Sequence, residues 1–218
     1  MTRRPLLLAL LLLALLPTLA LAADKPAAPA LVAGTDYEVI EGGQPFAPVK
    51  GKVEVVEVFG YTCIHCAHFQ SQVSAWKSRH AADVHFVPLA APFGGGWTPY
   101  AKAFYAAQSL GLLDKSHDAM FLALHSDGSL PLRNPAPQEI AAFYAKYGAD
   151  PQRFIQAYDS PAVAARMQQA DAFIQRSGVE ATPTLVVNGK YRVLGNSFDD
   201  VLRIADQLVA RERAGAKR

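Results

Sequence analysis

Cysteine is scarce in this sequence, which has only Cys63 and Cys66 among its 218 residues. A secreted protein usually uses paired cysteines as staples between distant segments. A bond between these two would close a loop of a single helical turn, which is too small to restrict the chain much. A structural staple is therefore a poor explanation for the pair, and chemistry is a better one.

The sequence also lacks a strong charge of either sign, since 21 Lys and Arg face 19 Asp and Glu. The basic residues are scattered apart from a short tail at 211–218, so no stripe typical of a nucleic-acid binder is present. No internal repeat is evident. The length fits one domain with a substantial core, with or without an insertion.

Long apolar runs are absent except near the N-terminus. Arg3 and Arg4 precede an apolar run over 6–16, and residues 20–22 place small side chains at the spacing of a cleavage site. The run is short for a membrane span, has no charged flank on its far side and contains no cysteine for lipid attachment. We therefore expect residues 1–22 to be a cleaved signal peptide, with an uncleaved anchor as the weaker alternative.

The two cysteines lie where an expected strand, 52–59, gives way to an expected helix. Thr62 is the expected N-cap, which places Cys63 in the first turn. Free N–H groups and the helix dipole there favour the thiolate, the reactive form. Cys66 lies one turn further on and can close a small ring with Cys63, so the pair has the geometry of a redox dithiol. The helical spacing continues through Phe69, Val73, Trp76 and His80.

The rest of the chain falls into two halves around a helical block. Further strands are expected at 36–40, 84–89, 184–187 and 190–194, with an Asn188-Gly189 hairpin turn between the last two. The βαβ unit predicts parallel strands and a site at their carboxyl ends. Between the halves the pattern is helical over 98–177, with proline-led starts expected at Thr98-Pro99, Asp150-Pro151 and Ser160-Pro161, and a last helix is expected from Ser197.

Three motifs carry a family resemblance: Cys63-Ile64-His65-Cys66, Thr182-Pro183 and the Val-Asn-Gly-Lys-Tyr run at 187–191. A βαβ unit with Cys-x-x-Cys at its helix start, followed by ββα with proline before its first strand, resembles the thioredoxin fold. The helical block resembles the insertion of the DsbA family of periplasmic thiol:disulfide oxidoreductases. The family usually has proline where Ile64 stands, a departure that bears on the redox potential and leaves the chemistry in place.

The resemblance covers residues 36–213 and implies an α/β chain with a thioredoxin-like fold and an inserted all-helical domain. From it we expect four parts: the signal peptide, a flexible tether over 23–35, a discontinuous thioredoxin-like domain over 36–97 and 178–213, and a helical domain over 98–177.

The resemblance also implies roles for individual residues. Cys63, nearer the exposed helix end, is the expected nucleophile, and Cys66 is its buried resolving partner. His65 is expected to stabilise the Cys63 thiolate and so to make the disulfide a stronger oxidant. Thr182-Pro183 is expected to form a proline loop that faces the dithiol and, with Ile64, binds the substrate peptide.

Glu57 is a candidate proton carrier on the strand that leads to the cysteines. Side chains alternate along a strand, so Glu54 and Glu57 point to opposite faces, and in a central strand at least one of them is covered. Glu57 lies nearer the active end and matches the family's buried acid by its distance before Cys63. A buried carboxyl has a raised pKa and can exchange a proton with Cys66.

The expected function is a periplasmic oxidase that donates its Cys63–Cys66 disulfide to newly exported proteins. Its partners would be those reduced proteins and a DsbB-type, quinone-linked membrane protein that restores the disulfide; the protein itself would be a monomer without a cofactor or metal. A reductase or isomerase of the same fold stays open, as does a periplasmic metal chaperone or peptide-binding module. Zinc sites of this type need a second ligand pair, which does not follow, and Ala67 after Cys66 rules out covalent haem attachment.

Overall fold

The computed structural model describes residues 29–216. The predicted signal peptide and the tether up to residue 28 lie outside the described residues. The chain divides into two units, 1–30 and 31–218, and the strands and helices belong to the second unit.

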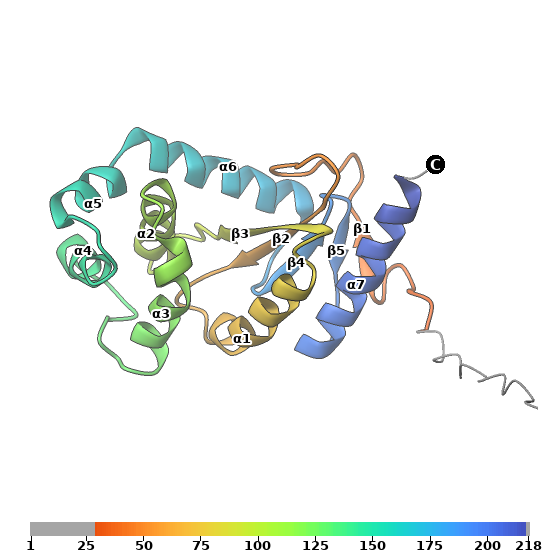
Figure 1. The fold of residues 1–218 in the computed structure, drawn as a ribbon, viewed down its shortest axis with the longest axis horizontal. Helices are drawn as coiled ribbons and strands as arrows, with labels where there is room; N and C mark the ends of the chain where they lie inside the picture. Colours follow the sequence, from red (N-terminus) through yellow and green to blue (C-terminus); the bar gives the residue numbers. More distant parts are fainter. Residues whose placement is uncertain (1–28, 217–218) are drawn as a thin grey trace, which may run out of the picture. The chain divides into compact units, whose positions relative to one another are not determined.

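A five-stranded sheet forms the centre of the described part (Figure 1). Its strands are β1 (Tyr37–Val39), β2 (Val53–Phe59), β3 (Val84–Ala90), β4 (Thr184–Val187) and β5 (Tyr191–Val193), in the order β1-β5-β4-β2-β3. β2 and β3 are parallel, as predicted, and the other neighbours are antiparallel. Each strand lies within one residue of its predicted limits, because the alternation and turn signals that define strands are local.

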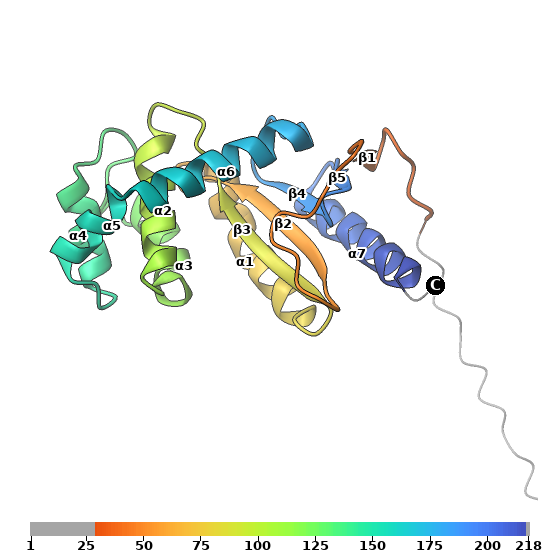
Figure 2. The same cartoon turned by 90° about the horizontal axis from the view of Figure 1, so that it is seen from above.

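Helices cover both faces of this sheet (Figures 1 and 2). The helices are α1 (Ile64–Arg79), α2 (Trp97–Ser109), α3 (Leu113–His125), α4 (Pro137–Ala145), α5 (Pro151–Tyr158), α6 (Pro161–Ser177) and α7 (Phe198–Gly215). α1 and α7 pack on one face, where Val53 and Val55 meet Phe69 and Leu208. α6 packs on the opposite face and forms the inserted all-helical domain together with α2 to α5.

The fold is thus a thioredoxin-like fold with an inserted all-helical domain. β2 lies inside the sheet, between β4 and β3, and all seven of its side chains are buried, including both glutamates. A strand covered on both faces reads as a nearly continuous apolar run, which is how residues 52–59 read in the sequence.

Two helix starts differ from the prediction. α2 begins at Trp97 after Gly96, so Pro99 is its third residue and Thr98 is not its cap. Proline is tolerated there because the first-turn N–H groups have no intrahelical partner. α4 begins at Pro137, one residue before the helical apolar spacing of the sequence, which runs over 138–147, and the N–H of Ala136 donates to Glu139 Oε2 at 2.7 Å.

The other two proline-led starts are confirmed. The side chains of Asp150 and Ser160 accept hydrogen bonds from the N–H groups of Arg153 and Val163, at 2.8 and 3.2 Å. Ser197 caps α7 by accepting from the N–H of Asp200 at 3.2 Å. The local capping chemistry therefore determines where these helices begin.

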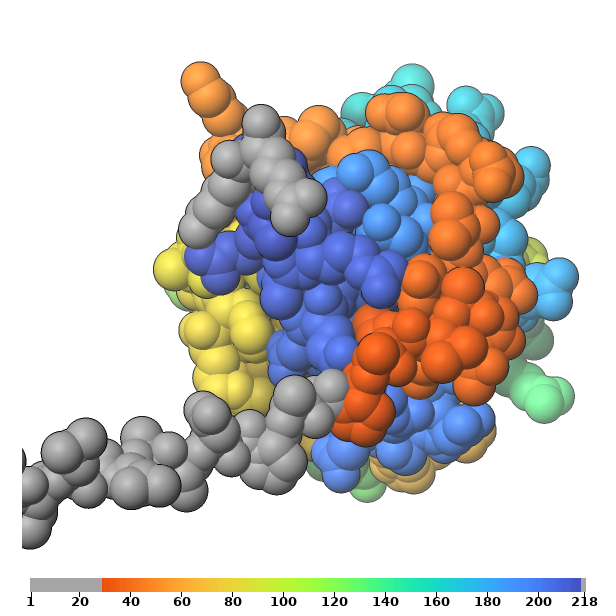
Figure 3. Space-filling model, turned by 90° about the vertical axis from the view of Figure 1, so that its right-hand side faces the viewer, coloured from red at the N-terminus to blue at the C-terminus, as the bar shows by residue number. Residues whose placement is uncertain are grey.

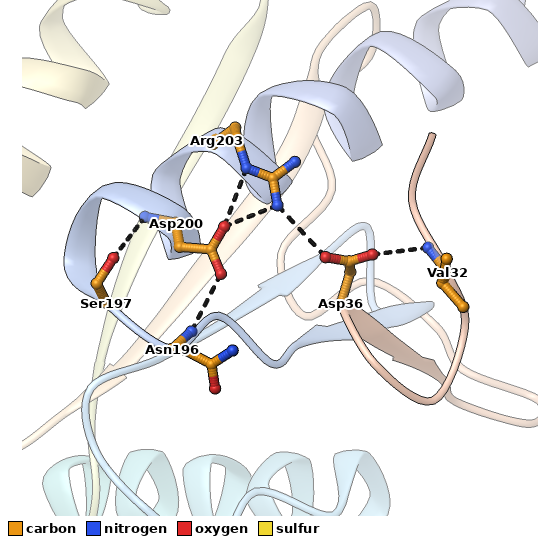
Figure 4. Close-up of polar contacts among 6 residues, drawn as sticks. All are labelled: Val32, Asp36, Asn196, Ser197, Asp200 and Arg203. Carbon is orange, nitrogen blue, oxygen red and sulfur yellow. Dashed lines mark hydrogen bonds and ion pairs between the residues drawn. The ribbon is translucent and has the colours of Figure 1, made fainter. Parts of the chain in front are cut away.

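Residues 31–36 are folded onto α7, where the sequence suggested the end of a flexible tether (Figure 4). The N–H of Val32 donates to Asp36 Oδ2 at 2.7 Å, and Arg203 of α7 donates to Asp36 Oδ1 at 3.3 Å and to Asp200 Oδ1 at 2.7 Å. Ordered structure thus begins before residue 36.

None of the described helices is both long and apolar enough to cross a membrane.

Figure 3 shows α7 from outside, with α1 on one side of it and the segment that carries β1 on the other. Arg211 of α7 donates to the hydroxyl of Tyr37 at 2.8 Å, and Arg213 donates to Asp83 at 2.7 Å, just before β3. α7 therefore ties both edges of the sheet together at the end that is remote from the cysteines.

Candidate active site

The cysteines lie at the carboxyl end of β2, where the site was predicted. Cys63 itself is the N-cap of α1, with φ −84° and ψ 115°, so the predicted cap at Thr62 is wrong by one residue. The reason is the tight turn over residues 60–63, in which the N–H of Cys63 donates to Gly60 O at 3.1 Å. As N-cap, Cys63 presents its sulfur to the unpaired N–H groups of the helix start.

The two sulfurs have different environments, although both cysteines are free thiols in this structure. Cys63 is partly exposed, whereas Cys66 is fully buried. The neighbouring Cys66 thiol and the backbone N–H groups at the start of α1 lower the pKa of Cys63 to about 5, well below that of a free thiol. Burial, together with the neighbouring Cys63, raises the pKa of Cys66. A thiolate is thus favoured at the accessible sulfur and disfavoured at the buried one.

Glu57 is 1% exposed, on the face of β2 that α1 covers. Burial raises the pKa of Glu57 to about 8, against the opposing effect of Lys77 on α1. Among the described residues its Oε1 has no hydrogen-bond partner. A buried carboxyl that is mostly protonated at neutral pH and unpaired at one oxygen can give or take a proton.

Glu54 is equally buried but is fully used by the fold. Its two carboxyl oxygens accept from the N–H groups of Phe46 and Ala47, at 2.7 and 2.5 Å, and so pin the preceding loop to β2. The expectation that at least one of the two glutamates is covered is confirmed for both.

Thr182 and Pro183 face the dithiol. The peptide bond between them is cis, and the Cys63 thiol donates to Thr182 O at 3.5 Å. The loop reaches this position because β4 follows it at once and pairs with β2, with Thr184 opposite Val58. Residues 119 apart in sequence are thereby brought together, as expected from the resemblance.

Ile64 and His65 both lie at the open surface of the site. Ile64 is 43% exposed, an apolar side chain beside the accessible sulfur. The His65 imidazole is exposed and makes no hydrogen bond within residues 29–216, while the backbone N–H of His65 contributes to the lowered pKa of Cys63. The imidazole's predicted role in the exchange remains a prediction.

Sequence reasoning missed three residues beside the turn: Tyr61, His117 and His125. His125 Nε2 lies 2.7 Å from Tyr61 O, and His117 Nδ1 lies 2.8 Å from the Tyr61 hydroxyl. The sequence pattern alone assigns both histidines to structure. The only sequence signal is their spacing of eight residues, which places them on one face of a helix.

No group of three or more His, Cys, Asp or Glu side chains within residues 29–216 is arranged to hold a metal ion. The reactive groups that the site brings together are the two thiols; the buried carboxyl of Glu57 lies on the strand that leads to them.

This fold, with an accessible cysteine at a helix start and a buried cysteine one turn later, defines a thiol:disulfide oxidoreductase of the thioredoxin class. Residues 43–207 match the family model described as thioredoxin. The chain is 37% identical to the thiol:disulfide interchange protein DsbA of Pseudomonas aeruginosa over 85% of this chain and 88% of that protein. It is 35% identical to the protein of the same name from Burkholderia cepacia, over 93% and 95% of the two chains.

Solved structures agree with these sequence relatives. The crystal structure of oxidoreductase DsbA from Xylella fastidiosa aligns with a TM-score of 0.82 and 52% identity, covering 84% of this chain and 98% of that one. The chain belongs to the DsbA family of the thioredoxin superfamily.

Proposed function

We propose that the protein is a thiol:disulfide oxidase that donates a Cys63–Cys66 disulfide to reduced proteins. The observation that carries the proposal is the asymmetry of the pair, a stabilised thiolate at accessible Cys63 beside a buried Cys66. A disulfide whose reduced form is stabilised in this way is a strong oxidant, because reduction yields the favoured thiolate.

The exchange runs in two displacements. A substrate thiolate attacks the Cys63 sulfur of the disulfide, forming a mixed disulfide and releasing Cys66 as a thiolate. Neutral Glu57 supplies the proton that the buried Cys66 sulfur takes up. The substrate's second thiolate then attacks the substrate sulfur of the mixed disulfide and displaces the Cys63 thiolate. Two electrons pass from substrate to enzyme, and the substrate gains a disulfide.

Substrate binding is assigned to the surface around Cys63. Ile64 offers exposed apolar area, and the backbone of Thr182 and Pro183 faces the reacting sulfur. Phe93 and Trp97 form a further apolar edge, with ring centroids 5.3 Å apart and Phe93 40% exposed. His65, exposed at the same surface, would stabilise the thiolate as it forms.

The proposal includes a cellular setting. Residues 1–22 would export the chain to the periplasm, where reduced exported proteins are the substrates. A DsbB-type membrane protein linked to quinone would reoxidise the dithiol, and the protein would work as a monomer. We assign residues 36–97 and 178–213 to the thioredoxin-like domain, and 98–177 to the helical domain.

A stoichiometric oxidation assay tests the proposal. The oxidised protein is mixed with an unfolded, reduced substrate that has two cysteines, and free thiols are counted over time. We expect one substrate disulfide per enzyme disulfide. Cys66→Ser, with Cys63 first converted to a mixed disulfide with a small aromatic thiol, should release that thiol and form a stable adduct through Cys63 with a substrate that has a single cysteine. Cys63→Ser serves as the matched control and should form no adduct. A wild-type protein that leaves the substrate thiols unchanged would contradict the proposal.

A further inference from the structure

The turn over residues 60–63, which we call the active-site turn, bears on both sulfurs at once. It sets Cys63 at the N-cap of α1. At its other end, the polar backbone N–H of Gly60 lowers the pKa of Cys66, against the larger effect of burial. Any displacement of the turn therefore changes the hydrogen bonds of both cysteines.

Helices α2 and α3 hold this turn from outside the sheet. Trp97, the first residue of α2, lies directly over Gly60, where a Cβ atom would fall 1.9 Å from Trp97 Cζ3. Glycine is thus required there by close approach. Trp97 blocks movement of the turn on that side.

His125 of α3 holds the backbone of the turn. Its Nε2 lies 2.7 Å from the carbonyl oxygen of Tyr61, two residues before Cys63. A carbonyl oxygen can only accept a hydrogen bond, so Nε2 must carry a proton and donate. This contact joins the last turn of α3 to the active-site turn.

His117 holds the Tyr61 side chain one hydrogen bond away. Its Nδ1 lies 2.8 Å from the Tyr61 hydroxyl, and burial lowers the pKa of His117 to about 4, so the ring is neutral. Burial also keeps the Tyr61 hydroxyl protonated by raising its pKa. The consistent arrangement has the hydroxyl donating to Nδ1.

Phe121 lies between the two histidines on the same face of α3. Its ring centroid is 5.1 Å from that of Tyr61, in an edge-on arrangement. Three consecutive turns of α3 thus engage one residue of the active-site turn: two through polar contacts and one through ring packing. Tyr61, which is 2% exposed, is therefore held by polar contacts as well as by packing.

We propose that His117 and His125 are positioning residues for disulfide exchange, which hold the active-site turn through Tyr61 so that the two sulfurs keep their unequal hydrogen bonding. The inference rests on the proposed function and extends it, because it assigns the inserted domain a part in setting the dithiol's reactivity.

The first test compares His125→Leu with His125→Gln. Leucine approximates the size of the imidazole but cannot donate, whereas the Gln amide places a donor near the position of Nε2. We expect His125→Leu to raise the pKa of Cys63. The pKa is measured from the absorbance of the thiolate as a function of pH. The glutathione equilibrium should shift toward the disulfide by about tenfold, and His125→Gln should restore most of both properties.

The second test uses Tyr61→Phe, which removes the hydroxyl and keeps the ring. We expect the glutathione equilibrium to shift in the same direction by about threefold, because one of the two polar contacts is lost. A threefold change corresponds to part of the free energy of one hydrogen bond. Ile140→Val is the control, a buried substitution in α4 that lowers the melting temperature without reaching the turn. It should leave the Cys63 titration unchanged.

Two outcomes would overturn the inference. One is a folded His125→Leu or Tyr61→Phe whose Cys63 titration and glutathione equilibrium stay within about twofold of the wild type, less than the loss of one hydrogen bond. The other is an Ile140→Val control that shifts them equally, which would make the effect one of general stability. If the oxidase proposal is wrong, the wild-type protein will fail to oxidise its substrate. The Cys63 titrations of the variants do not depend on that result and would still test the inference.

Discussion

The two ends of β2 each bury a glutamate, yet they differ in what the carboxyl group does. At the amino end, Glu54 accepts two backbone hydrogen bonds and has no free oxygen. At the carboxyl end, Glu57 is as deeply buried, has an unpaired Oε1 within the described structure and a pKa raised to about 8. Burial alone therefore does not distinguish a structural carboxyl from a chemical one; the missing hydrogen-bond partner does.

Of the substitutions that test the difference between Glu54 and Glu57, Glu57→Gln should have the largest effect. Ionisation of a buried carboxyl opposes folding, so wild-type stability from this group is full below pH 4.5 and is lost as the pH rises through about 8. A glutamine cannot ionise and removes that loss. We expect the variant's free energy of unfolding, relative to that of the wild type, to be about 2–4 kcal/mol more favourable at pH 9 than at pH 5. Urea unfolding of the reduced proteins measures it.

The same variant should exchange disulfides more slowly, by about tenfold or more, because the proton source for Cys66 is gone. Higher stability with lower activity separates a chemical role from a structural one. A variant that loses stability at alkaline pH, or that exchanges at the wild-type rate, would contradict the role given to Glu57.

Glu54→Ala tests the other end of the strand. It leaves the N–H groups of Phe46 and Ala47 without their acceptor, and we expect it to destabilise the protein by about 2–3 kcal/mol. Glu54→Gln, which keeps one acceptor oxygen, should lie between. The rate of disulfide exchange should not change in either variant; a slowing comparable to that of Glu57→Gln would erase the distinction between the two ends of β2.

Lys77→Met should give the smallest effect. Lys77 is exposed and opposes the raised pKa of Glu57, so its loss should move the upper end of the decline in stability, near pH 8, to higher pH by less than about one unit. The shift should fade at high salt, since exposed charges are screened. Lys115→Met, an exposed lysine of α3, is the matched control and should leave the decline where it is.

Much of this arrangement could be predicted from local sequence signals. The Asn188-Gly189 turn, the Asp150-Pro151 and Ser160-Pro161 helix starts and the parallel pair β2–β3 each depend on a few neighbouring residues. Side-chain alternation in β2 also predicted the covered glutamates. Cys63 and Cys66 were identifiable as reactive residues because a disulfide that closes so short a loop stabilises the fold little.

What the sequence did not reveal depends on contacts between distant segments. The start of α2 is displaced because Trp97 packs over Gly60, and no local signal records that contact. His117 and His125 resemble ordinary helix histidines until α3 is placed against Tyr61. The missing partner of Glu57 Oε1 likewise becomes visible only when the surrounding atoms are in position.

The central claim is that the unequal environments of Cys63 and Cys66 make their disulfide a strong oxidant. The most direct test is the equilibrium between the disulfide and the dithiol across a series of glutathione redox buffers, read by trapping free thiols. We expect the pair to stay reduced even in fairly oxidising buffer. A pair that stays oxidised in strongly reducing buffer would contradict the claim and would indicate a reductase instead.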